Sequence, residues 1–251
     1  MTRRLLYLVS HPIQYQAPLL RRIAGDPDIE LSVIFADDFS ASAYLDAGFG
    51  VEVAWDVPLR EGYENACLDQ VDLAERLGAC DALWLHGWQG PAMRRALKLA
   101  QGLDRPVLMR GENWSGAMPD GWGPRKLVKR RYLDHIFRRC AAFLAIGQAN
   151  RAYYLDHGVP EGRIFSMPYA VDNAFFRTRA EAADISALRR SLGLAEGVGV
   201  VLFAGKLTRR KRPDLLLDAW VRAQWAGGNR PALLFVGDGE LRTELEAKAP
   251  T

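Results

Sequence analysis

Cysteine is scarce in this chain, and its distribution excludes two kinds of site. Cys67, Cys80 and Cys140 are widely spaced and odd in number. They match neither a disulfide framework nor the usual spacing of metal ligands. We therefore expect buried free thiols in a protein of the reducing cytosol.

Long apolar runs are also absent. No stretch of about 18 apolar residues occurs, so no transmembrane helix is expected. The N-terminal run Leu5–Val9 ends at Ser10, His11 and Pro12. It is too short for the apolar core of a signal peptide, which needs about 7–15 residues. These absences predict a cytoplasmic protein.

Neither sign of charge dominates. The chain has 33 Lys and Arg residues against 30 Asp and Glu residues, a net charge of +3. Nucleic-acid-binding domains usually carry a strongly basic face, so no nucleic-acid partner is expected. Apolar residues make up 49% of the 251 residues, which is enough for the cores of one or two domains.

Short apolar runs alternate with helical patterns, which is typical of a parallel sheet covered by helices. The expected strands are Leu5–Val9, Glu30–Phe35, Val51–Ala54, Ala82–His86, Pro106–Arg110, Ala142–Ile146 and Ile164–Met167. The expected helices are Ala17–Ala24, Leu68–Leu77, Pro91–Gly102, Pro124–Cys140 and Ala149–His157. Together they predict an α/β fold with a Rossmann-like, doubly wound domain over residues 1–175.

A linker and a connecting helix are expected over residues 176–197. The helix Ile185–Leu192 ends at Gly193, which is suited to a left-handed cap. Residues 198–251 then begin a second domain. They contain two strand–turn–helix units, whereas a sheet usually has about five or six strands. We therefore expect this domain to be incomplete, with an exposed strand edge.

The loop after the strand Val200–Ala204 is the strongest candidate site. Gly205 has no side chain, so the backbone can approach a ligand closely. Pro213 suits the first turn of a helix whose N-terminal amides point to the same space. Lys206 and Lys211 would flank a diphosphate and stabilise it as it departs, without a metal. The alternative is an ordinary solvated basic loop.

A second glycine turn, Gly237-Asp238-Gly239, follows the strand Ala232–Val236. It lies at the carboxyl edge where open α/β sheets bind ligands, so it is a candidate for the nucleotide pocket. Alternatively, the two glycines make a tight turn and Asp238 caps the next helix.

The sequence resembles the GT-B glycosyltransferases of family 4 over about 110 residues. The resemblance is carried by Ala145–Ala149, Val159–Ile164 and Met167–Asp172, then by the Gly-Lys-Leu-x₃-Lys loop, Leu215–Trp220 and Phe235–Leu241. It implies an acceptor domain followed by the start of a donor domain, with both domains facing a cleft.

The activity implied by this resemblance is transfer of a sugar from a nucleotide-diphosphate sugar to a hydroxyl acceptor. It also implies retention at the anomeric carbon, no metal or other cofactor, and a role in cell-surface polysaccharide or glycolipid synthesis. The chain departs from the family at Lys206, where arginine is usual. The family's two glutamates separated by seven residues have no counterpart before Thr251, so turnover by these 251 residues is not expected.

Three positions near strand ends of the first domain are candidate catalytic residues. His11 follows the first strand, and nearby Gln14 offers an amide for sugar hydroxyls. His86 ends the fourth strand. Glu112 follows the fifth strand beside Arg110 and could orient or deprotonate an acceptor hydroxyl. The alternatives are a capped turn around His11, a hydrogen-bonded structural histidine at 86, and an Arg110–Glu112 structural pair.

The helix from Pro124 carries Arg125, Lys126, Lys129 and Arg130. These side chains could contact the inner face of a membrane that holds a lipid-linked acceptor, although an ordinary surface helix is the favoured interpretation. The acidic pairs Asp26/Asp28 and Asp37/Asp38 are interpreted as solvated rather than metal-binding.

Other functions remain open. A non-catalytic sugar- or nucleotide-binding module and a nucleotide-sugar epimerase of the same fold both fit the motifs. An NAD-dependent dehydrogenase does not, because the first strand leads into His11-Pro12-Ile13-Gln14 instead of a G-x-G-x-x-G loop.

Overall fold

The computed structural model describes residues 1–46, 48–117, 124–225 and 230–249. The chain divides into two compact units: Met1–Ala41 with Trp55–Asp172, and Ser42–Ala54 with Asn173–Thr251. The sequence-based division at residue 175 differs from this one chiefly in keeping residues 42–54 with the first domain.

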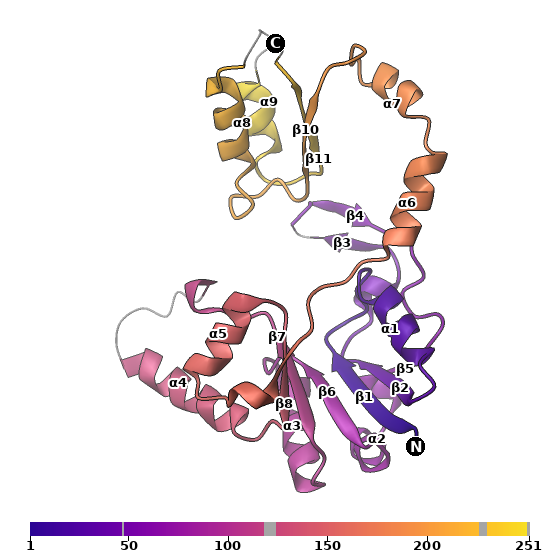
Figure 1. Cartoon of the computed structure of the whole chain (residues 1–251), viewed down its shortest axis with the longest axis vertical. Helices are drawn as coiled ribbons and strands as arrows, with labels where there is room; N and C mark the ends of the chain where they lie inside the picture. The colour runs from indigo at the N-terminus through magenta and orange to yellow at the C-terminus, as the bar shows by residue number, and fades with distance from the viewer. Residues whose placement is uncertain (47, 118–123, 226–229, 250–251) are drawn as a thin grey trace. The chain divides into compact units, whose positions relative to one another are not determined.

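The first unit is built on a seven-stranded sheet in the order β5-β2-β1-β6-β7-β8-β9 (Figure 1). Every strand pair in it is parallel. The strands are β1 (Arg3–Val9), β2 (Ile29–Phe35), β5 (Glu64–Cys67), β6 (Ala82–His86), β7 (Val107–Gly111), β8 (Ala142–Ala145) and β9 (Ile164–Ser166). The predicted parallel sheet is therefore confirmed.

Two strand assignments differ from the sequence-based expectation. Edge strand β5 was not predicted, because Glu-Asn-Ala-Cys lacks the apolar run that marks a buried strand. The predicted strand Val51–Ala54 is β4 (Val51–Val53), which pairs antiparallel with β3 (Tyr44–Asp46) in the second unit and does not join the large sheet.

Helices cover the sheet on both faces. They are α1 (Ala17–Ala24), α2 (Leu73–Ala79), α3 (Pro91–Gly102), α4 (Pro124–Phe137) and α5 (Gln148–Asp156), with short 3-10 helices η1 (Phe39–Ala41), η2 (Leu68–Gln70), η3 (Ser115–Ala117) and η4 (Glu161–Arg163). Helices α1 and α3 have the predicted bounds. Proline in the first turn suits both, because its missing N–H would have no partner there.

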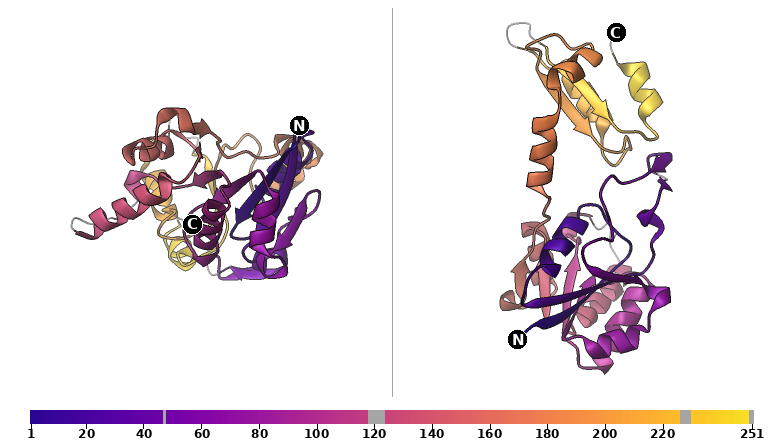
Figure 2. Two further views of the ribbon diagram at one scale, coloured as in Figure 1. Left: turned by 90° about the horizontal axis from the view of Figure 1, so that it is seen from below. Right: turned by 90° about the vertical axis from the view of Figure 1, so that its right-hand side faces the viewer.

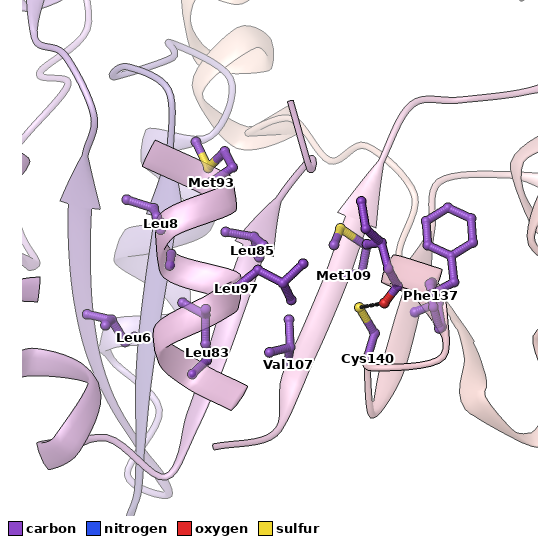
Figure 3. Close-up of a cluster of buried hydrophobic side chains, with 14 of the residues drawn as sticks. Leu6, Leu8, Leu83, Leu85, Met93, Leu97, Val107, Met109, Phe137 and Cys140 are labelled. Atoms are coloured by element: carbon purple, nitrogen blue, oxygen red, sulfur yellow. Dashed lines mark hydrogen bonds between the residues drawn. The ribbon is translucent and has the colours of Figure 1, made fainter. Parts of the chain in front are cut away.

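Alternate residues of the central strands point to opposite faces of the sheet and belong to two apolar cores. Leu6 and Leu8 of β1 pack on one face with residues of α2, α3, α4 and α5 (Figure 3). Tyr7 and Val9 pack on the other face with Leu20 of α1. This period of two is the expected consequence of strand geometry. All three cysteines are free and buried, as predicted, and Cys140 lies in the first of these cores.

The second unit contains a two-stranded parallel sheet of β10 (Val200–Ala204) and β11 (Ala232–Val236). Helices α8 (Pro213–Arg222) and α9 (Arg242–Lys248) pack on it through a small core that includes Leu217 and Leu245. Leu202 and Val236 remain 58% and 52% exposed. The predicted exposure of apolar strand residues is therefore present in the described part of this unit.

The predicted linker is largely helical. Helix α6 (Asn173–Ala182) extends into this expected linker, and α7 (Ile185–Ser191) follows it (Figure 2). No residue of α6 is buried. Its sequence therefore needs no apolar stripe with the helical period, which is the pattern from which a helix is predicted. Its alanine, arginine and glutamate residues nevertheless favour helix intrinsically. Gly193 has the predicted left-handed conformation, with φ of 66°.

Helix α4 ends at Phe137, three residues before its predicted end. Its Leu127 and Val128 are exposed, whereas Leu133 is buried. Among the helices that the structure describes, none is both long and apolar enough to cross a membrane.

Candidate functional site

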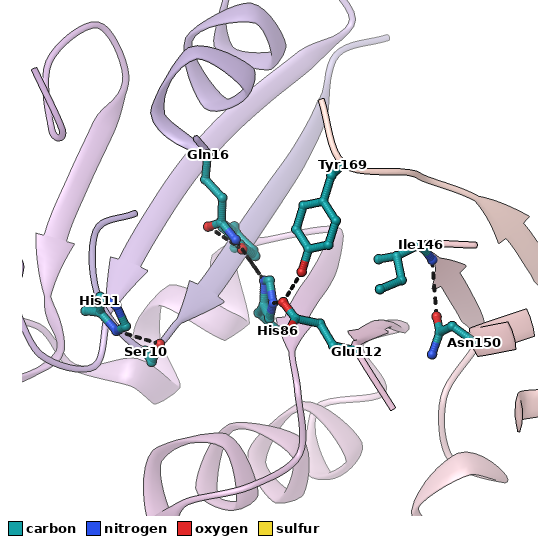
Figure 4. A network of polar contacts seen from close by, with 9 residues as sticks. Ser10, His11, Gln16, His86, Glu112, Ile146, Asn150 and Tyr169 are labelled. Carbon is teal, nitrogen blue, oxygen red and sulfur yellow. Dashed lines mark hydrogen bonds and ion pairs between the residues drawn. The ribbon is translucent and has the colours of Figure 1, made fainter. Parts of the chain in front are cut away.

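Polar residues of the first unit gather at the carboxyl edge of the large sheet. Strand β1 lies between β2 and β6, and the chain proceeds from these strands toward opposite edges of the sheet. Such a reversal opens a crevice where α/β sheets bind ligands. His86 ends β6, Glu112 follows β7 and Tyr169 follows β9, and all three side chains come together there (Figure 4).

The imidazole of His86 lies against two buried polar side chains. Its Nδ1 is 2.6 Å from the Tyr7 hydroxyl oxygen and 3.3 Å from Nε2 of Gln16. Tyr7 also donates to Oε1 of Gln16 at 3.0 Å. The Tyr7 ring stacks on Trp84 with centroids 3.9 Å apart, and Trp84 is a core residue. Burial raises the pKa of Tyr7 well above its ordinary value, which keeps its hydroxyl protonated.

The shared protons constrain the state of His86. The Tyr7 hydroxyl has one proton, which it donates to Gln16 Oε1, so its oxygen is left to accept a proton from Nδ1 of His86. The neutral Nδ1–H tautomer provides this proton and leaves Nε2, the ring nitrogen nearest Glu112, able to accept a proton. The neutral Nε2–H tautomer instead requires Tyr7 to donate to His86. The cluster can therefore hold or release one proton beside Glu112.

Glu112 is the most accessible ionisable member of this cluster, with its side chain 55% exposed. Its Oε1 is 3.9 Å from His86 Nε2, which is ion-pair range, and it accepts a hydrogen bond from the Tyr169 hydroxyl. His86, followed by Tyr169, lowers the pKa of Glu112 to about 2. The group is therefore a carboxylate at neutral pH, able to accept a hydrogen bond or a proton from a hydroxyl.

Arg110 is a buried cation that packs against Tyr169 of this cluster. It is 2% exposed, and its guanidinium carbon lies 5.1 Å from the centre of the Tyr169 ring. Such a cation–π contact is favourable when desolvated. Tyr169 also meets Tyr15 edge to face, at 5.2 Å between centroids. Within the described residues, no ion pair joins Arg110 to Glu112 within 4 Å. The described contacts of Glu112 are to His86 and Tyr169, and the charge of Arg110 acts on it by helping to lower its pKa.

Asn150 fixes the loop that carries Glu112. It is 3% exposed, and its Nδ2 donates to the carbonyl of Asn113 at 2.7 Å. Its Oδ1 accepts from the Ile146 amide at 3.1 Å (Figure 4). This side chain therefore ties the loop after β7 to the end of β8, which restricts the position of Glu112.

His11 and Gln14 lie in the loop after β1 and make no described hydrogen bond or ion pair with His86, although the charge of His86 contributes to lowering the pKa of His11. Nδ1 of His11 is 2.9 Å from Ser10 Oγ, and its ring lies 4.7 Å from that of Phe39. Burial lowers the pKa of His11 more than Asp37 raises it. These contacts agree with the capped-turn alternative. The proposed site roles of His11 and Gln14 stay predictions.

Sequence reasoning missed Tyr7, Gln16 and Tyr169. Tyr7 stands in the otherwise aliphatic run Leu5–Val9, a visible signal that one polar group enters the core. Gln16 and Tyr169 carried no comparable signal, because their role depends on how the loops after β1 and β9 fold back over His86.

In the second unit, the turns after β10 and β11 pack backbone to backbone. A Cβ at Gly237 would lie 2.0 Å from the Gly205 carbonyl oxygen, and one at Gly239 would lie 2.8 Å from that of Leu207. The Leu207 amide donates to the Asp238 carbonyl at 2.8 Å. The glycines therefore have a packing role. Asp238 does not cap α9, because that helix has Leu241 at its N-cap.

The side chain of Asp238 instead pairs with Arg242 at 2.8 Å and accepts from the Gly239 amide. Nearby, a cavity of about 600 Å³ is lined by Gly48, Phe49, Gly50, Val51, Thr208, Asp238, Gly239 and Glu240. Its size lies within the range of small-molecule sites. Two of the predicted nucleotide-pocket residues, Asp238 and Gly239, thus line a cavity of suitable size.

The two candidate diphosphate cations differ in their surroundings. Lys206 Nζ is 2.5 Å from Asp46 Oδ1 and 4.8 Å from the centre of the Phe49 ring. This lysine lowers the pKa of Asp46. Lys211 is exposed, and its ammonium has no ion pair among the described residues. A diphosphate at this loop would therefore have to compete with Asp46 for Lys206.

The acidic pairs have turn roles. Asp26 accepts from the Asp28 amide, and Asp37 from the Phe39 amide, both at 2.9 Å. Across the described parts of the chain, no group of three or more His, Cys, Asp and Glu side chains is arranged to hold a metal ion.

No protein-family model matches this chain. Over 72 residues it is 46% identical to a glycogen synthase from Halorhodospira halophila, a match that covers 28% of this chain and 15% of that protein. The crystal structure of Anabaena HepE in complex with UDP matches with a TM-score of 0.63 and 17% identity, over 99% of this chain and 65% of that one. HepE in complex with UDP and glucose gives a TM-score of 0.60 at 15% identity, over 98% and 65%.

A protein from Listeria monocytogenes, described as a candidate UDP-N-acetylglucosamine 2-epimerase, matches with a TM-score of 0.55 and 12% identity, over 99% of this chain and 65% of that one. The chain thus spans less than two thirds of the length of each of these proteins. The likeness confirms the predicted fold: an α/β chain with a central parallel sheet, of the GT-B type shared by glycosyltransferases and nucleotide-sugar epimerases.

Proposed function

We propose that this chain is part of a glycosyltransferase that moves a sugar from a nucleotide-diphosphate sugar to a hydroxyl acceptor. The observation that carries the proposal is the His86–Glu112 pair at the carboxyl edge of a GT-B sheet, 3.9 Å apart and open on the carboxylate side. The 46% identity to a glycogen synthase over 72 residues and the UDP-bound state of the HepE structures support a nucleotide-sugar donor.

On the acceptor side, Glu112 would accept the hydrogen bond of the attacking hydroxyl. Its low pKa makes it a weak base on its own. His86 beside it can take up the proton through Nε2 when its Nδ1–H donates to the Tyr7 hydroxyl oxygen, whose own proton goes to Gln16 Oε1. Arg110 lies too deep to reach an acceptor directly and would hold Tyr169 in place.

On the donor side, Lys206 and Lys211 would stabilise the departing nucleoside diphosphate, with the α8 N-terminus near the same loop. Lys206 stands where arginine is usual in the family that this chain resembles. Its ammonium group can pair with a phosphate, but it binds with less directional preference than a guanidinium. The reaction would need no metal, and activity unchanged by EDTA is the expected result. Retention at the anomeric carbon is part of the proposal and is read from the anomeric proton coupling of the product.

The acceptor class is proposed as a cell-surface polysaccharide or glycolipid precursor. Exposed Leu127 and Val128 on α4, among the cations Lys126, Lys129 and Arg130, support peripheral contact with a membrane. Arg125 belongs to the same predicted patch, and its side chain lies outside the described residues.

A nucleotide-sugar epimerase is the second candidate, favoured by the Listeria neighbour with its TM-score of 0.55. The two activities leave different products. A transferase releases the nucleoside diphosphate only when an acceptor is glycosylated or water replaces it, whereas an epimerase converts one nucleotide-sugar into its epimer. Proton NMR of UDP-glucose and UDP-N-acetylglucosamine, incubated with the whole enzyme of which this chain is proposed to be part, separates these outcomes.

Donor binding by the 251-residue chain can be tested by titration calorimetry with UDP and UDP-glucose. We expect Lys206→Ala and Lys211→Ala each to weaken binding about tenfold, which corresponds to about 1.4 kcal/mol. Lys98→Ala, an exposed cation on α3, is the matched control. Absence of binding, or equal weakening in the control, would count against a donor site at this loop.

A further inference from the structure

Gln16 is a buried glutamine at the start of α1 whose side chain does not serve that helix. It occupies the N-cap position and is 5% exposed, and among the described residues its side chain caps no helix amide. The helix has less need of a cap than most, because Pro18 in its first turn has no N–H to satisfy. The Gln16 amide is instead directed at Tyr7 and His86 (Figure 4).

The two ends of this amide offer opposite chemistry to their neighbours. Its Oε1, which only accepts, lies 3.0 Å from the Tyr7 hydroxyl oxygen, and its Nε2, which only donates, lies 3.3 Å from His86 Nδ1. The two ends are nearly the same size, so turning the amide over exchanges them within the same space. Tyr7 is buried, so the orientation of the amide decides where the neighbouring protons go.

With Oε1 toward Tyr7, the protons follow one course. The Tyr7 hydroxyl donates to Gln16, and its oxygen accepts from Nδ1–H of His86, 2.6 Å away. The contact between Gln16 Nε2 and Nδ1 then brings two donors together and supplies no hydrogen bond. Nε2 of the ring, which lies 3.9 Å from Glu112 Oε1, has no proton in this neutral state and is able to accept one.

With Nε2 of Gln16 toward Tyr7, the course is reversed. The Tyr7 oxygen accepts from the amide, and the Tyr7 proton goes to Nδ1 of His86. The neutral ring then has its proton on Nε2, where it faces Glu112. In this state His86 cannot take a proton at the side where an acceptor hydroxyl would lie.

We propose that Gln16 is a positioning residue for His86. With its Oε1 toward Tyr7, it holds the ring in the Nδ1–H tautomer, so that Nε2 stays free for a proton. The consequence for catalysis rests on the proposed glycosyl transfer. There, the O–H bond of the acceptor breaks, its proton goes to Nε2, and its electron pair forms the new bond to the anomeric carbon as the nucleoside diphosphate leaves.

The other ionisable groups near the ring keep one charge state at and above neutral pH. Burial raises the pKa of Tyr15 and of Tyr169, so both hydroxyls stay protonated near pH 7. Arg110 is a permanent cation, and Glu112 is a carboxylate. Burial lowers the pKa of His11, which favours its neutral form. The tautomer of the neutral ring is therefore left to Tyr7 and Gln16.

The test is NMR of the ¹⁵N-labelled 251-residue chain, because the ¹⁵N shifts of an imidazole distinguish its two neutral tautomers. We expect His86 to be Nδ1–H in the unmodified protein. Gln16→Met should shift the ratio toward Nε2–H at least about fivefold, since Tyr7 then donates to Nδ1. This corresponds to about 1 kcal/mol, the net worth of one hydrogen bond. Gln101→Met, which removes a partly buried amide from α3, is the matched control.

His157 is the internal reference for these spectra. Its Nδ1 lies 2.6 Å from Asp134 Oδ1, so it has a proton on Nδ1 in every variant. A His86 ring that is Nε2–H in the unmodified protein would overturn the proposal. So would a tautomer ratio that Gln16→Met leaves unchanged.

Gln16→Glu decides the question if Gln16→Met does not fold. A carboxylate presents acceptor oxygens to both neighbours, so Nδ1 of His86 should be protonated, and an unprotonated Nδ1 would contradict the proposal. None of these spectra requires a substrate, so loss of the proposed transferase function would leave the result intact. In the whole enzyme, Gln16→Met should lower kcat with little change in the KM of the donor.

Discussion

Nε2 of His86 lies 3.9 Å from Oε1 of Glu112, although the two residues come from different strands of the sheet. The imidazole is positioned from behind by Tyr7 and Gln16, and the carboxylate by Tyr169. The pair therefore combines a proton carrier that is held in place and mostly shielded from solvent with an exposed acceptor, an arrangement suited to activating a hydroxyl.

Glu112→Gln should reveal a pH-dependent contribution to stability. The folded-state pKa of Glu112 is lowered from its ordinary value of 4.5 to about 2. Its contribution is therefore fully present above about pH 5 and is lost as the pH falls through 2. Because the side chain is 55% exposed, we expect no more than about 1 kcal/mol.

Urea unfolding of both proteins at pH 7, 5 and 3 measures this difference. It should be constant from pH 7 to 5 and smaller at pH 3. Glu75→Gln, on the exposed face of α2, is the control and should show no such trend. A difference that grows toward low pH would contradict the ionised state of Glu112.

Tyr7→Phe should destabilise the first unit without opening a large cavity. The substitution leaves Gln16 Oε1 without its donor and removes the oxygen beside His86 Nδ1. A buried polar group left unpaired costs about 1–3 kcal/mol. Tyr132→Phe, at a partly exposed position on α4, should change the free energy of unfolding by less than about 0.5 kcal/mol. Equal effects at the two positions would refute the buried network.

Asp46→Asn should strengthen binding of UDP to the second unit. Asp46 holds Lys206 at 2.5 Å, and removing its charge leaves the ammonium available to a phosphate. A partly exposed ion pair is worth up to about 1 kcal/mol, which corresponds to roughly fivefold in Kd. Calorimetry at low salt measures the change, with Asp26→Asn as a control of equal charge. An unchanged Kd would mean that Lys206 does not contact the nucleotide.

Gly237→Ala should disrupt the second unit. Its Cβ would meet the Gly205 carbonyl oxygen at 2.0 Å, and the residue has φ of 142°, a conformation that favours glycine. Strain of this kind costs about 1–3 kcal/mol. Gly199→Ala is the control, since its Cβ would meet Pro231 at an ordinary 3.5 Å. Urea unfolding should separate the two variants, and similar midpoints would show that the turns can move apart.

Local patterns in the sequence predicted most of the first unit. The apolar runs Leu5–Val9 and Ala82–His86 are short enough to favour a buried strand over a helix, and Pro91 with the apolar periodicity after it indicates where α3 begins. Edge strand β5 and the exposed helix α6 were not predicted. Neither has the periodic apolar residues from which strands and helices are predicted.

The sequence by itself determined which ends of which strands carry polar chemistry. It named His86, Glu112 and Arg110, because a polar residue that closes an apolar run is visible locally. Only the tertiary structure decided their partners. Glu112 meets His86 and Tyr169 instead of Arg110, and Lys206 meets Asp46, because contacts between residues far apart in sequence depend on strand order and loop paths that no local pattern encodes.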